Sequence, residues 1–291
     1  MRYEAPASID KAVALLAAEN GMSRILAGGT DLLVQFRSGS PAPDLVVDIK
    51  RISRMRRIVA ENGGFRIGAA VPCAALGEHK KLVKAWPGIV EAARLIGSTQ
   101  IQGRATIAGN LCNASPAADS VPALIAAGAI ATILGPNGNR EVPVEEVPIA
   151  PGKTSLQKGE LLVSLFLPAR PPHSGDAYLR FIPRSEMDIA VVGAGVCLTL
   201  DEEGVCTAAR VSLGAVAARP LLVEEAARAL IGTRLEEQAL KALAAAASAA
   251  WRPIDDKRGT KEFRIRVAGV LARRAAERAL ARAKGNKIRG H

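Results

Sequence analysis

Apolar residues at helical spacing predict several helices in this chain. The segment 8–20 carries one apolar face, with Ser8 as a candidate N-cap and Gly21 at a typical C-terminal position. The same reasoning predicts further helices over 32–36, 76–96 with a break at Pro87, 222–231, 235–250 and a basic stretch near the C-terminus.

Short apolar runs bounded by turn residues predict strands. In the first half of the chain these runs cover 24–27, 45–49, 65–69, 129–134 and 161–167. The runs 45–49 and 65–69 lie on either side of a turn region at 62–64. The stretch 97–122 is polar, contains glycine and lacks clear periodicity, which is typical of a segment that contacts a ligand.

A proline-rich linker separates two regions with different predicted patterns of strands and helices. Pro168, Pro171 and Pro172 precede His-Ser-Gly, so a boundary is predicted between 168 and 175. Strands are predicted beyond it over 178–183, 189–200 and 205–213, with a turn at 201–204. Because helices then follow the strands, the pattern favours an α+β layer. We therefore expect one domain over 1–172, in two parts of about 1–55 and 56–172, and a second over 173–291.

The composition permits a sizeable core. Hydrophobic residues make up 49% of the 291 residues and charged residues 23%, while aromatic residues make up only 3%. Alanine and aliphatic side chains must therefore fill the core. Few aromatic rings are available to stack on bases, which argues against a single-stranded nucleic-acid platform.

The formal charge of +11 is concentrated in two places, 50–57 and 264–289. The second stretch interleaves arginine with apolar residues and predicts a helix with a solvated or partner-facing basic face. Such charge attracts anionic ligands, acidic partners, membrane surfaces or nucleic acid. Peripheral membrane contact stays open on this ground, and nucleic-acid binding is not favoured.

The cysteines and histidines do not form a metal-binding pattern. Cys73, Cys112, Cys197 and Cys206 include no CxxC pair, and the three histidines lie near none of them at ligand-like spacing. Scattered cysteines indicate a reducing compartment. The N-terminus has no apolar signal core and no stretch resembles a membrane span, so we expect a cytoplasmic, soluble protein without a metal site of its own.

A double-glycine loop joins the predicted strand 24–27 to the helix that follows. Gly28 and Gly29 adopt dihedrals closed to other residues and let a phosphate reach backbone N–H groups. Thr30 and Asp31 can cap the helix, whose N-terminal end favours an anion. On this loop alone, a capped tight turn is the simpler explanation.

A second loop, 106–120, gathers small residues, amides and hydroxyls around Gly109 before a helix predicted near Pro122. Its polar side chains could bind a sugar chain, a phosphate or the edge of a heterocycle. Ser120 is also a reasonable N-cap. No Ser/His/Asp or Cys/His set accompanies the loop, so no catalytic residue is assigned.

Taken together, the two loops resemble a known family. The sequence ILAGGTDL at 25–32, followed about eighty residues later by TIAGNLCNASPAAD at 106–119, is similar to the FAD-binding medium subunit of the molybdenum hydroxylases. That family includes xanthine dehydrogenases, aerobic carbon monoxide dehydrogenases and hydroxybenzoyl-CoA reductases. The similarity extends over nearly the whole chain, including DIAVVGAGV at 188–196.

The resemblance implies an α+β fold: a two-part FAD-binding domain of the vanillyl-alcohol-oxidase type, then a smaller α+β domain with a three-stranded sheet and helices. It also implies which residues contact FAD. Backbone N–H groups of 27–31 would hold the pyrophosphate, and Ile189 would lie near the flavin ring. The full set is Ile25, Leu26, Ala27, Gly28, Gly29, Thr30, Asp31, Leu32, Ile96, Thr106, Gly109, Asn110, Asn113, Asp119, Leu162, Arg180 and Ile189.

Simpler roles remain open for four of these residues. Ile96 and Leu162 fit an ordinary core equally well, and Arg180 could be a solvated strand residue. Ile189 could be a buried strand residue.

The resemblance further implies the partners and the electron path. Substrate would be oxidised at molybdopterin on a large subunit, and electrons would pass through two [2Fe–2S] clusters on a small subunit to this chain's FAD. The assembly would be a dimer of heterotrimers, and the final acceptor a quinone, oxygen or a pyridine nucleotide. The main alternative is a self-sufficient flavin-dependent oxidoreductase, for which the sequence offers no convincing acid–base residue.

This chain departs from the family pattern at three points. Ala108 replaces the second glycine of the family's TIGGN, which could shift the loop. Met187 occupies a place that is acidic in NAD-reducing xanthine dehydrogenases, which argues against NAD as acceptor. The cysteine-rich insertion of the reductase branch has no counterpart here.

Overall fold

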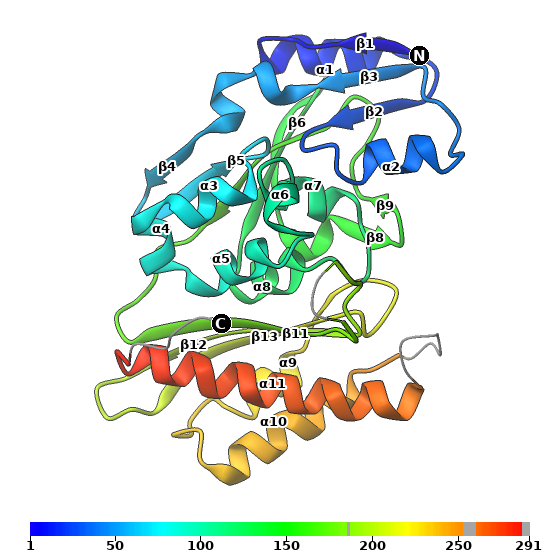
Figure 1. The fold of residues 1–291 in the computed structure, drawn as a ribbon. Coiled ribbons are helices and arrows are strands. Elements are labelled where there is room, and N and C mark those ends of the chain that lie inside the picture. The colour runs from blue at the N-terminus through cyan, green and yellow to red at the C-terminus, as the bar shows by residue number, and fades with distance from the viewer. Residues whose placement is uncertain (185–186, 253–259, 287–291) are drawn as a thin grey trace.

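Three layers built on separate sheets follow one another along the chain (Figure 1). The computed structural model describes residues 1–184, 187–252 and 260–286. The first layer is a parallel sheet of order β1-β3-β2, whose strands cover Arg2–Glu4, Leu45–Asp48 and Ser23–Leu26 respectively. Helices α1 (Ile9–Ala18) and α2 (Leu32–Arg37) connect them. As predicted, Ser8 caps α1 by accepting a hydrogen bond from the N–H of Lys11.

The second layer is an antiparallel sheet of order β4-β5-β10-β6-β7. Its strands cover Ile58–Glu61, Gly64–Gly68, Leu161–Leu167, Ile130–Gly135 and Gly138–Pro143. The helices of this layer are α3 (Cys73–Glu78), α4 (Lys80–Ala85), α5 (Pro87–Arg94), α6 (Thr99–Gln102), α7 (Ile107–Cys112) and α8 (Ser120–Ala126). Short 3₁₀ turns at Ile49–Arg51, Ser53–Arg56 and Val144–Glu146, and the pair β8 (Pro148–Ala150) and β9 (Lys153–Thr154), complete it.

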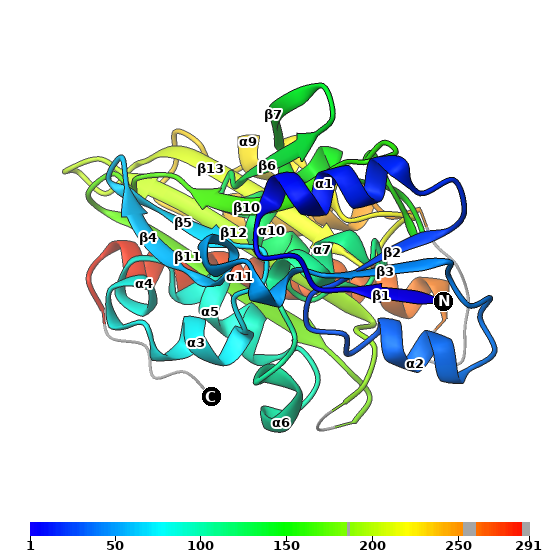
Figure 2. The ribbon, with the colours of Figure 1, turned by 90° about the horizontal axis from the view of Figure 1, so that it is seen from above.

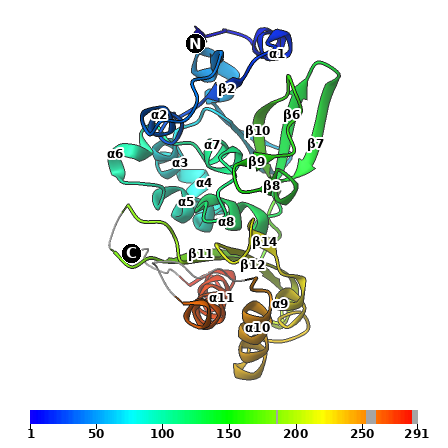
Figure 3. The same ribbon diagram turned by 90° about the vertical axis from the view of Figure 1, so that its right-hand side faces the viewer.

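The third layer contains three long antiparallel strands, β11 (Ser174–Phe181), β12 (Val192–Leu200) and β13 (Cys206–Gly214), with the two-residue β14 (Leu221–Leu222) at one edge. Helices α9 (Glu224–Arg228), α10 (Glu237–Ala249) and α11 (Lys261–Ala283) follow. Figure 3 shows α11 and α10 below this sheet and the helices of the second layer above it. The expected α+β order, with a three-stranded sheet backed by helices, is therefore confirmed.

Two hydrophobic clusters fill the interior. One joins the first two layers around residues such as Leu45, Ile67 and Leu124, and the other lies between the third sheet and α10–α11. Helix α8 packs closely on β12: a Cβ at Gly195 would lie 2.5 Å from the carbonyl oxygen of Pro122. The second and third layers are therefore in direct backbone contact.

One strand was missed from the sequence. The turn at 62–64 joins β5 to this strand, β4, whereas the predicted strand 45–49 contains β3 of the first sheet. Strand β4 has the sequence IVAE with its two middle residues exposed, and four residues are too few to show a period of two. The predicted linker is also shorter, because Ser174 and Gly175 already pair within β11.

The stretch 97–122 proved more regular than its sequence suggests. It contains α6, α7 and the start of α8, which are helices of four to seven residues and too short to show a period. Ser120 was expected to be an N-cap, but it is the first residue of α8. Its hydroxyl and its N–H instead donate to Oδ1 of Asn110, at 2.7 and 3.0 Å.

The C-terminal basic helix is less solvated than predicted. Arg264 is 3% exposed. Arg278 and Arg282 contact Glu91 of α5, so they face the second layer rather than solvent. The end of the predicted stretch, 287–289, lies outside the described residues. Among the helices that the structure describes, none has the length and apolar character needed to cross a bilayer.

Candidate cofactor site

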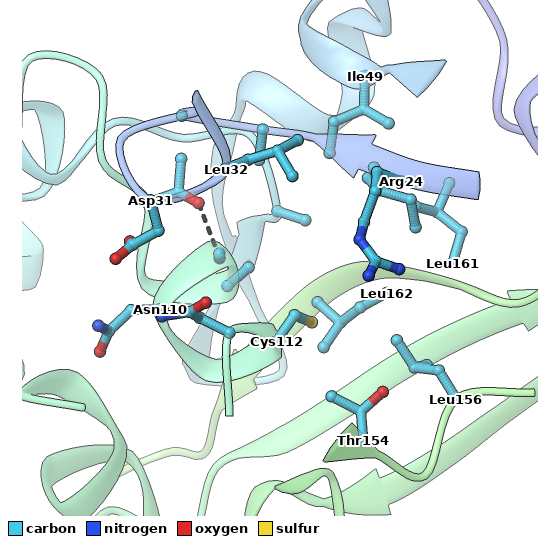
Figure 4. A pocket seen from close by; sticks show the side chains of 18 of the residues that line it. Arg24, Asp31, Leu32, Ile49, Asn110, Cys112, Thr154, Leu156, Leu161 and Leu162 are labelled. Atoms are coloured by element: carbon cyan, nitrogen blue, oxygen red, sulfur yellow. Dashed lines mark hydrogen bonds between the residues drawn. The ribbon is translucent and has the colours of Figure 1, made fainter. Parts of the chain in front are cut away.

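A cleft of about 460 Å³ lies where the first and second layers meet (Figure 4). Its walls come from the end of β2 and α2, from α7, and from the segment 152–162. Thirteen of the predicted residues line it: Ile25, Ala27, Gly28, Gly29, Thr30, Asp31, Leu32, Ile96, Thr106, Gly109, Asn110, Asn113 and Leu162. Ile96 and Leu162 also belong to the core, as the simpler interpretation expected, and their contact with FAD stays a prediction.

Gly28 brings the two glycine loops into contact. A Cβ at this position would lie 2.3 Å from the carbonyl oxygen of Arg104 and 2.9 Å from Cα of Ala105. Only glycine permits that approach between backbones that are distant in sequence. A hydrogen bond of 3.2 Å from Nε2 of Gln35 on α2 to Oδ1 of Asn113 joins the loops a second time.

The first loop presents a row of unsatisfied backbone donors. Gly29 has φ of +79°, which turns the chain sharply before α2. Within the described part of the chain, the N–H groups of Gly28, Gly29, Thr30 and Asp31 donate to no protein acceptor. Asp31 is the N-cap residue of α2 but makes no side-chain cap hydrogen bond, contrary to the expected capping role. Burial raises the pKa of the Asp31 carboxyl.

The second loop is held by its own side chains. Oγ1 of Thr106 accepts a hydrogen bond of 2.9 Å from the N–H of Gly109 and so caps α7. Ala108, which stands where the family has glycine, is 4% exposed and packs in the core. Its methyl group is therefore accommodated by the core beside the cleft.

The third wall was largely missed from the sequence. Lys158 and Gly159 lie in the turn before β10, and Arg24 extends from β2 toward the middle of the cleft (Figure 4). Both cations could balance an anionic ligand. Lys158 could have been suspected from the sequence because it stands beside a glycine in a turn. Arg24 could not, because its sequence context is that of an ordinary exposed strand residue.

No nucleophile is evident in the cleft. Burial raises the pKa of the Cys112 thiol to about 12, so this side chain stays protonated. The carboxylate of Glu160 is paired with Arg140 at 2.8 Å. Across the described residues, no three His, Cys, Asp or Glu side chains gather as a metal site.

Four predicted residues lie outside the lining of the cleft. Leu26 is at the end of β2, and Ile189 precedes β12 with 52% of its surface exposed, so it is not a buried strand residue. Asp119 and Arg180 form an ion pair of 2.8 Å whose side chains are 13% and 7% exposed. Arg180 is therefore not solvated, and its Nε has no hydrogen-bond partner.

Burial raises the pKa of Asp119 to about 6, although the charge of Arg180 and hydrogen bonds from Arg180 and Tyr178 act in the opposite direction. The hydroxyl of Tyr178 donates to Oδ1 of Asp119 at 3.3 Å. Desolvation of the carboxylate is the larger effect. Burial of the ionised Asp119 carboxylate at the end of the second loop is therefore unfavourable.

Comparison with known proteins identifies the family. Residues 1–170 match the profile described as the FAD binding domain in molybdopterin dehydrogenase, and residues 177–279 match the CO dehydrogenase flavoprotein C-terminal domain. This chain belongs to the FAD-binding subunits of the molybdopterin dehydrogenases. The resemblance drawn from the two loops is confirmed, and so is FAD as its cofactor.

Relatives of this flavoprotein family match along almost the entire chain. The carbon monoxide dehydrogenase medium chain of Afipia carboxidovorans is 37% identical over 282 residues, with 97% of each chain covered. The xanthine dehydrogenase FAD-binding subunit of Escherichia coli O157:H7 is 32% identical, also with 97% of each covered. The solved CO dehydrogenase from Oligotropha carboxidovorans aligns with a TM-score of 0.92 at 36% identity, over 97% of this chain and 98% of that one.

The buried Asp119 is expected to make stability pH-dependent. Its folded-state pKa of about 6 lies above its ordinary value of 3.8. Between these values the folded state keeps a proton that the unfolded state releases, so stability falls as pH rises. We expect a loss of about 1–3 kcal/mol through this group from pH 4 to pH 7. Urea unfolding of Asp119→Asn should lack that part of the slope, and an unchanged slope would contradict the assignment.

Proposed function

We propose that this flavoprotein relays electrons within a molybdopterin-dependent complex. A large subunit would oxidise the substrate at molybdopterin, and a small subunit with [2Fe–2S] clusters would pass the electrons to this chain. When bound, FAD supplies the redox step between the clusters and a terminal acceptor. The near full-length match to a medium chain and to an FAD-binding subunit supports this role.

The unsatisfied N–H groups of the first loop are the structural observation that supports FAD binding. The N–H groups of 28–31 have no protein acceptor among the described residues. Gly28, Gly29 and Thr30 are partly buried, and donors in such places need an acceptor. A row of such groups suits the oxygens of a diphosphate. Thr106 and Gly109 would line the opposite side, while Arg24 and Lys158 would balance the charge.

The predicted residues outside the lining of the cleft would contact the flavin end of the cofactor. Asp119 lies at the end of the second loop and pairs with Arg180. Ile189 follows Arg180 in the chain and is exposed. We propose 1–172 as the FAD-binding domain and 173–291 as the second domain. A dimer of heterotrimers in the cytoplasm is the proposed setting.

Purification from the native host tests the electron-relay role. We expect this chain to co-purify with a large and a small polypeptide, and the assembly to contain FAD, molybdenum and iron. The chain expressed alone should bind FAD but oxidise no substrate. If the lone chain oxidises a substrate at the full rate of the native preparation, it is a self-sufficient oxidoreductase and the relay role is wrong.

A further inference from the structure

A second hollow, of about 340 Å³, lies behind the first glycine loop and shares Ala27 with the cleft. Its charged lining consists of Lys50, Arg51, Arg56 and Arg104, with Asp48 as the single acid. Small or nonpolar residues complete the wall. None of these four cations lines the FAD cleft.

The basic residues of the segment 50–57 are mostly exposed because apolar residues hold the segment against the core. Ile49, Ile52 and Met55 are at most 2% exposed and recur every third residue. This spacing matches the three residues per turn of the two 3₁₀ turns, which contain Ile49 and Met55 and are joined by Ile52. Apolar anchoring therefore holds the backbone. Arg51, which lies between two anchors, and Arg56, which follows the last one, are exposed.

Arg104, which precedes the second loop, also lines the hollow, and hydrogen bonds fix its backbone. Its N–H donates to the carbonyl of Ile101 at 2.9 Å, and its own carbonyl lies against Gly28. The next residue, Ala105, accepts a hydrogen bond of 2.8 Å from Cys73. Both loops thus contribute charged residues to the lining of one hollow.

The acid in the hollow does not neutralise these arginines. Oδ2 of Asp48 accepts from the hydroxyl of Tyr3 at 2.6 Å and from Nζ of Lys50 at 2.8 Å. Arg51, Arg56 and Arg104 have no carboxylate within salt-bridge distance among the residues described. By contrast, Arg66 pairs with Glu61 and Glu141, and Arg140 pairs with Glu160. These three arginines of the hollow are exposed and are free to pair with an anion from outside the chain.

We propose that this hollow binds a diphosphate-bearing anion, with a nucleoside diphosphate as the fitting size. Guanidinium groups form paired hydrogen bonds with phosphate oxygens. A diphosphate carries roughly three negative charges at neutral pH, which equals the number of unpaired arginines. The bound anion would contact the back of the loop that presents N–H groups to the cleft, and the site is independent of the FAD proposal.

Calorimetric titration of the FAD-saturated protein with ADP tests the site. FAD saturation keeps ADP out of the first cleft, and visible absorbance of released flavin reports any displacement. We expect saturable binding of one ADP per chain, competition by inorganic pyrophosphate, and no binding of adenosine. Equal affinities for ADP and pyrophosphate would assign recognition to the diphosphate alone, and tighter ADP binding would add the nucleoside. Absence of saturation, or release of FAD by ADP, would overturn the proposal.

Matched double variants separate the hollow from general surface charge. Arg56→Ala with Arg104→Ala removes two lining cations and should weaken ADP binding at least about tenfold, since each loses charge-assisted hydrogen bonds. Arg54→Ala with Arg57→Ala removes the same charge from exposed neighbours outside the lining and should change affinity less than about twofold. Equal weakening in both pairs would mean an unspecific basic surface and would refute the site.

Discussion

Replacing Gly28 with valine is expected to lower the affinity for FAD by roughly 100-fold, because separating the two loops would remove hydrogen bonds to the charged diphosphate worth about 1.5–3 kcal/mol. Even a Cβ at this position would lie 2.3 Å from the carbonyl oxygen of Arg104. The two loops would have to separate, so the donors of 28–31 and the turn at Thr106 could no longer reach one diphosphate. Titration of apoprotein with FAD, followed by visible absorbance, measures the loss.

Gly103→Ala is the matched control. Gly103 has helical dihedrals of −65° and −12°, and its Cβ would meet the carbonyl of Gln100 at an ordinary 3.5 Å. This variant should bind FAD like the unchanged protein. Gly28→Ala provides a milder step at the same position, and circular dichroism shows whether each variant is folded. A folded Gly28→Val chain with unchanged FAD affinity would show that the loops need not be in contact.

Arg180→Met is expected to destabilise the chain by about 3 kcal/mol at pH 8, because it leaves a buried carboxylate without its counter-ion. The loss should be smaller at pH 5. Burial already raises the pKa of Asp119 to about 6, and removal of Arg180 raises it further, so the carboxyl is protonated at pH 5. Urea unfolding at the two pH values measures both effects.

Two further variants show whether charge burial is the cause. Adding Asp119→Leu to Arg180→Met removes the orphaned charge and should restore much of the stability. Arg228→Met breaks the exposed pair with Glu225, whose side chains are 65% and 70% exposed, and should cost less than about 1 kcal/mol. A similar loss in Arg180→Met at pH 5 and pH 8 would argue against a titrating partner.

The family and the cofactor could be predicted from the sequence because their signals are local. Gly28 and Gly29 follow a strand directly, and Thr106 caps a helix three residues before Gly109, so short motifs record both loops. The α+β order of the second domain was also recognisable, since its three strands are long and largely buried.

Features that depend on distant contacts could not be predicted. The third wall of the cleft, with Lys158 and Gly159, is brought in by β10, and its sequence resembles an ordinary turn. Glu91 meets Arg282 across nearly two hundred residues, so the basic helix looked solvated when read alone. Likewise, only the fold shows that Arg180 faces Asp119 and is buried.

Crystallographic density for FAD in the loaded protein tests the central claim most directly. We predict the diphosphate in the cleft, with its oxygens within hydrogen-bonding distance of backbone N–H groups of 28–31 and with the loop at Thr106–Asn110 on its other side. Density for FAD that contacts only one of these loops, or that lies elsewhere on the chain, would contradict the account.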